Sequence, residues 1–85
     1  MGKQMNETPV FSRNMGMKYR AEFDSDDYVI YEGWALNPKA ATTDTIWQIC
    51  KHTYDSNGNL TETNWADGSD DFSFAWDSRS DYSYS

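Results

Sequence analysis

The chain offers one nucleophile next to one general base, because Cys50 and His52 lie two residues apart in a run of strand-forming residues. On a strand both side chains leave the same face, and a thiol beside an imidazole is the pair that cysteine-dependent catalysis uses. Such catalysis also needs a group that orients the imidazole, an oxyanion hole and a cleft, which a short aromatic-rich chain has little room to build. Two ligands also fall short of a metal site. We therefore expect no catalytic residue, no metal site and no cofactor, with Cys50 a half-buried strand residue and His52 a hydrogen-bonded surface residue.

Two aspartate-rich turns partly match the sequence pattern of a calcium-binding loop. Residues 55–59, Asp-Ser-Asn-Gly-Asn, place oxygen ligands at the first, third and fifth positions of such a loop. The sixth position is Leu60 where a glycine is needed, and the twelfth is Ala66 where a bidentate glutamate is needed. The turn at residues 67–71 fails in the same way. A third acidic turn, residues 24–27, could hold a divalent cation between copies of the chain, but a solvated turn is the simpler interpretation.

Length and composition limit the chain to one small domain. A chain of 85 residues buries a modest core, and its single cysteine rules out an internal disulfide. Four Trp, six Tyr and four Phe accompany only three Ile, two Val and two Leu. Aromatic residues favour strands, and Trp and Tyr are also over-used at interfaces. We therefore expect partner subunits to stabilise this domain.

Charge is distributed unevenly along the chain. Residues 1–20 carry four cations and one carboxylate, which is a net charge of +3. The whole chain has a net charge of −7, so residues 21–85 have a net charge of −10. A body this acidic repels phosphates, which disfavours nucleic acid as a partner. We interpret the basic N-terminal region as an arm that docks onto a protein. The sequence predicts neither a signal peptide nor a membrane-spanning run, so we expect a soluble protein made in a reducing cytoplasm without membrane association.

The hydrophobic pattern predicts an all-β fold. The spacing predicts an extended docking arm over residues 1–16 and a small β domain over residues 17–85, an antiparallel meander or sandwich of about five strands with almost no helix. The strands are expected at residues 17–23, 28–35, 46–54 and 60–66, followed by a last strand that places Phe72, Phe74 and Trp76 on one face. Residues 36–44 are expected to form a loop, because Asn37-Pro38 disfavours helix there.

The strongest local feature is a β-hairpin. Two strand-prone runs, residues 46–54 and 60–66, flank the cluster at residues 55–59. Asp, Asn and Gly in such a cluster tolerate a positive φ or cap a tight turn. This hairpin assigns the chain to the small β class.

Several short motifs follow one another in a distinctive order over about residues 28–85. They are Tyr31–Ala35, Thr45–Ile49, Lys51–Asn59, Trp65–Gly68, Phe72, Trp76–Arg79 and the Tyr-Ser ending. This order of motifs resembles a family of small, mostly uncharacterised proteins that are encoded among the structural genes of tailed bacteriophages. The usual Gly-Thr-rich loop of that family is replaced here by residues 36–42, and the residues before about 28 do not share the resemblance.

The resemblance implies a virion component without catalytic activity, synthesised in the cytoplasm of a bacterial host. Its expected partners are capsid, neck or tail proteins and further copies of itself, in a decoration, cement or fibre-attachment role. The alternative is a receptor- or glycan-binding module on a tail or head fibre. A phage-encoded enzyme or host inhibitor is a more distant alternative. The expected contact residues are Met5, Val10, Phe11 and Met15 in the arm and Trp34, Trp47, Trp65, Phe74, Trp76, Tyr82 and Tyr84 in the β domain.

Overall fold

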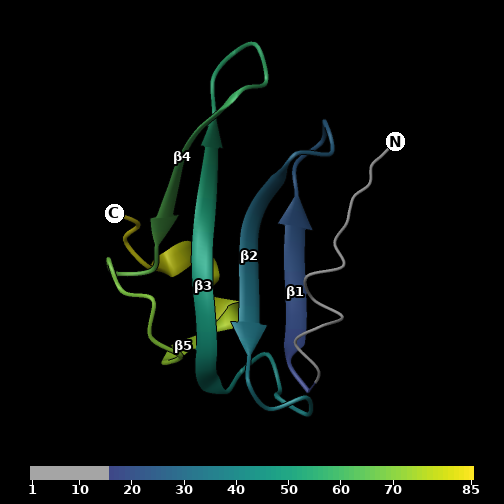
Figure 1. Ribbon diagram of the computed structural model, residues 1–85, viewed down its shortest axis with the longest axis vertical. Coiled ribbons are helices and arrows are strands. Elements are labelled where there is room, and N and C mark those ends of the chain that lie inside the picture. The colour runs from purple at the N-terminus through teal and green to yellow at the C-terminus, as the bar shows by residue number, and fades with distance from the viewer. Residues whose placement is uncertain (1–15) are drawn as a thin grey trace.

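The computed structural model describes residues 16–85, which form one antiparallel sheet with a single short helix (Figure 1). The expected all-β fold is confirmed. The arm residues Met5, Val10, Phe11 and Met15 lie outside the described residues. The elements are β1 (Lys18–Phe23), β2 (Val29–Ala35), β3 (Thr45–Tyr54), β4 (Leu60–Trp65), β5 (Phe74–Ala75) and the 3-10 helix η1 (Trp76–Asp81).

The sheet is organised around β3, its longest strand. The order is β1-β2-β3-β4, a meander in which each strand pairs with the next one along the chain. One edge of β3 pairs with β2. The other edge is shared, because β4 pairs with residues 50–54 and β5 pairs with residues 45–47 of the same strand. β3 therefore connects all the later elements to the N-terminal hairpin.

An aspartate caps each of the two tight turns between strands. Asp24 Oδ1 accepts the backbone N–H groups of Asp26 and Tyr28 at 2.8 and 3.0 Å. Asp55 Oδ1 accepts those of Asn57 and Asn59, each at 2.9 Å. Such bonds from aspartate to the following backbone are what favour it in turns. These carboxylates act as turn caps, in agreement with the interpretation of both turns from sequence.

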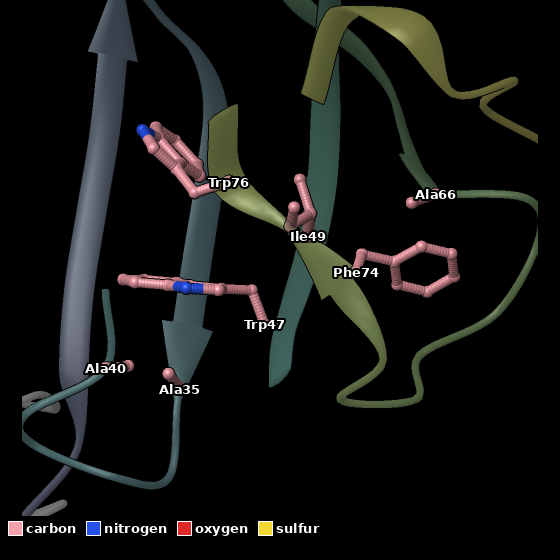
Figure 2. Packing of buried hydrophobic residues seen from close by; sticks show 7 residues of the cluster. All are labelled: Ala35, Ala40, Trp47, Ile49, Ala66, Phe74 and Trp76. Atoms are coloured by element: carbon pink, nitrogen blue, oxygen red, sulfur yellow. The ribbon is translucent and has the colours of Figure 1, made fainter. Parts of the chain in front are cut away.

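The core lies on one face of the sheet (Figure 2). Side chains of successive strand residues point to opposite faces, so Ala35 of β2 and Trp47 and Ile49 of β3 share this face. Trp76, the first residue of η1, packs on it with its ring centroid 6.1 Å from that of Trp47. A Cβ atom on Gly33 would lie 2.6 Å from Cε3 of Trp76, so only glycine leaves room for this ring.

The C-terminal segment, residues 74–85, covers this core face and crosses behind the sheet in Figure 1. The Tyr82 hydroxyl accepts the Ala75 N–H at 2.9 Å, and the Tyr84 hydroxyl donates to the Arg79 carbonyl at 2.6 Å. Arg79 also reaches β1, where its Nε atom lies 2.8 Å from a carboxylate oxygen of Glu22. These bonds hold the C-terminal segment against the sheet, so that this segment, and not a second sheet, forms the second layer of the domain.

The last strand differs from the expectation. Only Phe74–Ala75 is a strand, and the chain then enters η1, which the sequence analysis did not expect. The change of direction lets Trp76 fill the space above Gly33, while the Asp77 N–H bonds to the Thr42 carbonyl. No helix among residues 16–85 has the length and apolar character that crossing a membrane requires.

Candidate functional site

The second face of the sheet, which we call the open face, is not covered by any other described segment (Figure 1). By strand alternation it carries the residues between those of the core: Tyr19 from β1, Trp34 from β2 and Trp65 from β4. None of these three rings is fully buried. The open face therefore carries three large, half-buried aromatic side chains.

The three rings form a row across the sheet, which we call the aromatic row. Tyr19 and Trp34 are paired across β1 and β2, and their ring centroids lie 5.7 Å apart. The centroids of Trp34 and Trp65 lie 6.4 Å apart, with the rings tilted by 49°. These separations are typical of favourable aromatic pairs. The row is thus a packed platform that tertiary contacts already hold in place.

A polar cluster lies beside the row on the same face. His52 Nε2 lies 2.6 Å from Oε1 of Glu32, and the other carboxylate oxygen, Oε2, accepts the hydroxyl of Tyr19 at 2.6 Å. Cys50 Sγ lies 3.8 Å from His52 Nε2. On the far side of the imidazole, Nδ1 lies 2.8 Å from the Thr63 hydroxyl. Both nitrogens of the ring and both oxygens of the carboxylate therefore have a partner.

Strand register creates this cluster. Glu32 is paired with Cys50 across β2 and β3, and Cys50 is paired in turn with Trp65 on β4. His52 follows Cys50 on the same face and is paired with Thr63. A shift of either pairing by one residue would send one side chain of each pair to the opposite face. Cys50 is only 2% exposed although it lies on the open face.

The surroundings shift the acidity of these groups. Burial raises the pKa of Glu32, but the hydrogen bonds from His52 and Tyr19 outweigh this effect and leave the pKa below its ordinary value. Burial, followed by the hydrogen bond to Glu32 and its charge, raises the pKa of the Tyr19 hydroxyl well above its ordinary value. Glu32 is therefore ionised at neutral pH, with a neutral phenol beside it.

The thiol of Cys50 is not activated as a nucleophile. Burial and the nearby charge of Glu32 raise its pKa to about 12. Catalytic cysteines have a lowered pKa, because a neighbouring cation or a helix N-terminus stabilises the thiolate. In this cluster the imidazole bonds to a carboxylate instead of withdrawing the thiol proton. This arrangement disfavours the thiol–imidazole chemistry considered from sequence.

A groove of about 570 Å³ lies where the two hairpin turns meet. Tyr28 and Tyr54 stack along it with centroids 5.0 Å apart, and its rim includes Asp24 and Asp55. Both of these carboxylates already cap backbone N–H groups of their own turns. We assign no ligand to this groove.

The structure separates the residues predicted as contacts into three groups. Trp34 and Trp65 lie on the open face. Tyr82 and Tyr84 are half-buried in the C-terminal segment, where their hydroxyls bond within the domain. The remaining rings are core residues, which corrects their assignment to a surface that contacts partners: Trp47, Phe74 and Trp76 are 0%, 8% and 3% exposed. Trp47 is buried because the C-terminal segment packs on it, and Phe74 and Trp76 belong to that segment and join the same core.

Sequence reasoning missed Glu32 and Tyr19 as members of the site. The pair Cys50 and His52 was recognised because residues two positions apart on one strand lie on the same face of the sheet. Glu32 joins them from another strand, and nothing local in its surroundings marks it. An explicit register between residues 28–35 and 46–54 would have identified it, since Glu32 is the partner of Cys50.

Comparison of the chain with protein-family models, with curated proteins and with solved structures found no match.

Proposed function

We propose that this chain is a non-enzymatic structural subunit of a tailed-bacteriophage virion, which attaches to a capsid, neck or tail protein through its open face. The observation that supports this role most directly is the aromatic row of Tyr19, Trp34 and Trp65 on a face that no other described segment covers. The resemblance of residues 28–85 to small proteins encoded among phage structural genes supplies the virion context.

The chemistry of the face indicates the kind of partner. Trp and Tyr are enriched where a protein surface is buried against another one. Between residues 16 and 85 there are 13 carboxylates and five Lys or Arg residues. A surface of this charge favours a partner that offers apolar side chains surrounded by basic ones. The partner we propose is therefore a virion protein with an apolar patch and a basic rim.

A second candidate is a glycan-binding module, because half-buried Trp and Tyr rings at a protein surface are also the surfaces on which sugars stack. Sugar recognition additionally requires polar groups that are free to bond hydroxyls. On the open face both oxygens of Glu32 already accept bonds, and the Gln48 amide donates to the Asp70 carbonyl at 2.8 Å. This use of polar atoms within the domain favours a protein partner over a glycan.

The proposal is tested with particles purified from a phage that lacks the gene. The recombinant chain, a variant carrying Trp34→Ala and Trp65→Ala, and a control variant Leu36→Ala are each added to these particles. Leu36 is 63% exposed and lies outside the sheet, so its loss matches the removal of an exposed apolar side chain without touching the open face. Sedimentation then measures the bound fraction.

We expect the wild-type and Leu36→Ala chains to bind at a saturable ratio and the double variant to lose at least about tenfold in affinity, since truncation of central aromatic contacts costs that much or more. Far-ultraviolet circular dichroism checks that the double variant is folded. Equal binding of all three chains would exclude the open face as the contact. Saturable binding to purified host glycans instead of particles would favour the second candidate.

A further inference from the structure

We propose that Glu32, Cys50 and His52 form a Zn²⁺ site on the open face. The three side chains offer a carboxylate oxygen, a thiolate sulfur and an imidazole nitrogen, all within 4.8 Å of one another. These are the three donor types that zinc binds in proteins. The inference stands on this geometry alone and does not depend on the proposed function.

Two of the three distances between ligand atoms lie within about 1 Å of those around a tetrahedral ion. Zn²⁺ bonds of about 2.0–2.3 Å in tetrahedral geometry place neighbouring ligand atoms about 3.3–3.6 Å apart. Cys50 Sγ and His52 Nε2 are already 3.8 Å apart. His52 Nε2 and Glu32 Oε1 lie 2.6 Å apart, within hydrogen-bonding distance, and must separate by less than about 1 Å to admit the ion. A rotation of the Glu32 carboxylate supplies that movement.

The partners that orient these ligands are already in place. A histidine that binds a metal usually donates its second ring N–H to a neighbouring acceptor, and a carboxylate that binds a metal usually has a hydrogen bond to its second oxygen. Here Thr63 Oγ1 lies 2.8 Å from Nδ1 of His52, and the Tyr19 hydroxyl donates to Oε2 of Glu32. Neither contact uses the atoms proposed to bind the ion, which are Nε2 of His52 and Oε1 of Glu32. This outer set of bonds distinguishes the cluster from a chance grouping of acidic side chains.

The donor set selects the metal. A thiolate and an imidazole disfavour Mg²⁺ and Ca²⁺, which take oxygen ligands, and favour Zn²⁺ among the common cellular divalent ions. Three protein ligands leave a fourth position for water or for a group from a partner. Loading releases the thiol proton of Cys50, and one more proton if His52 is protonated at the start. No redox step is involved.

Titration of the full chain with Co²⁺, a spectroscopic substitute for Zn²⁺, tests the site. The solution contains a phosphine reductant, so that no added thiol competes. Cys50 is the only cysteine in the chain, so a thiolate-to-cobalt charge-transfer band in the near ultraviolet reports this residue alone. Zn²⁺ is then added to displace the cobalt, and calorimetry with Zn²⁺ gives the stoichiometry and the affinity.

Four variants of the cluster and one control variant separate the ligands from the surrounding fold. Cys50→Ser is expected to abolish the charge-transfer band, and Glu32→Gln and His52→Gln are each expected to weaken Zn²⁺ binding by more than tenfold. Thr63→Val, which removes only the partner of His52 Nδ1, should weaken it by about tenfold. Asp26→Asn, in an exposed turn away from the cluster, is the matched control and should bind as the wild type does. Near-ultraviolet circular dichroism checks the packing of each variant.

We expect one Zn²⁺ per chain, the charge-transfer band with Co²⁺ and a higher thermal midpoint in the presence of zinc. The absence of the band in a folded chain would overturn the proposal. Equal affinity of the wild-type and His52→Gln chains would also overturn it, because the ion would then be held by surface carboxylates. One ion for every two chains would mean that the metal bridges the thiolates of two molecules. That result would likewise contradict a site formed within one chain.

Discussion

His52 and Glu32 lie 20 residues apart in the chain, and Nε2 of the imidazole lies 2.6 Å from Oε1 of the carboxylate. The contact crosses from β3 to β2 diagonally, because Glu32 is paired with Cys50 and His52 with Thr63. Exposed fractions of 12% and 20% for the two side chains place the pair largely out of water. Hydrogen bonds in such surroundings are costly to leave unmade.

Removal of this carboxylate is expected to destabilise the domain. Glu32→Ala leaves the Tyr19 hydroxyl and Nε2 of His52 without their acceptor, and we expect a loss of about 1–3 kcal/mol in the free energy of unfolding. Urea titration measures this free energy, and a chelator in the solution keeps the chain free of metal. Glu62→Ala is the control, because Glu62 is exposed on β4 and should change stability by less than about 0.5 kcal/mol. An equal effect of the two substitutions would contradict the central place of Glu32.

A methyl group at Gly33 is expected to disturb the core. The added Cβ would lie 2.6 Å from Cε3 of Trp76, too close for any side-chain contact. We expect Gly33→Ala to lower the free energy of unfolding by about 1–3 kcal/mol, the usual cost of overpacking. In a Trp76→Leu background the same change should cost less, because the ring that it meets is gone. A cost that is unchanged in that background would show that the backbone at Gly33, and not this contact, is responsible.

Slow modification of Cys50 is expected in the folded chain. The thiol is 2% exposed and its pKa is raised to about 12, so both access and the thiolate fraction are low at neutral pH. Labelling with iodoacetamide, followed by mass spectrometry, should be at least about 100-fold slower than in urea, in keeping with the raised pKa. Labelling as fast as that of a free thiol peptide would contradict the burial of Cys50.

The cap at Asp55 is expected to make stability depend on pH. The hydrogen bond from the Asn59 backbone, followed by others in the turn, lowers the pKa of this exposed carboxyl below its ordinary value of 3.8. A lowered pKa adds stability above the ordinary value, and this contribution is lost as the pH falls through the value in the folded state. Asp55→Asn should therefore be less stable than the wild type at neutral pH, and the difference should shrink in acid. Thermal unfolding across this range measures the difference, and one that is constant with pH would contradict the assigned role.

The local elements were predictable from the sequence. The turn at residues 55–59 contains its own cap and its own positive-φ glycine, Gly58, so the hairpin depends on neighbouring residues alone. Strand alternation likewise predicted the four longer strands to within a residue at each end. The meander then follows because short connections join strands that lie side by side.

The features that were not predictable depend on contacts between distant segments. Trp76 leaves the strand direction because Gly33, 43 positions earlier, provides the space for its ring. The burial of Trp47 depends on the same C-terminal segment. Glu32 meets Cys50 only through the register of β2 and β3, which a nine-residue connection does not define by its length. The burial of Trp47, Phe74 and Trp76 and the polar cluster were therefore missed. Trp34 and Trp65, which were predicted as contact residues together with these rings, lie on the open face.

We propose, as the central point, that the chain is a structural component of a virion. Quantitative mass spectrometry of purified particles from the phage that encodes it, with isotope-labelled peptides of this chain and of the major capsid protein, measures its copy number directly. We predict a fixed ratio of the two proteins that survives density-gradient purification and is the same in independent preparations. Absence from particles, while the chain is abundant in infected cells, would contradict the claim.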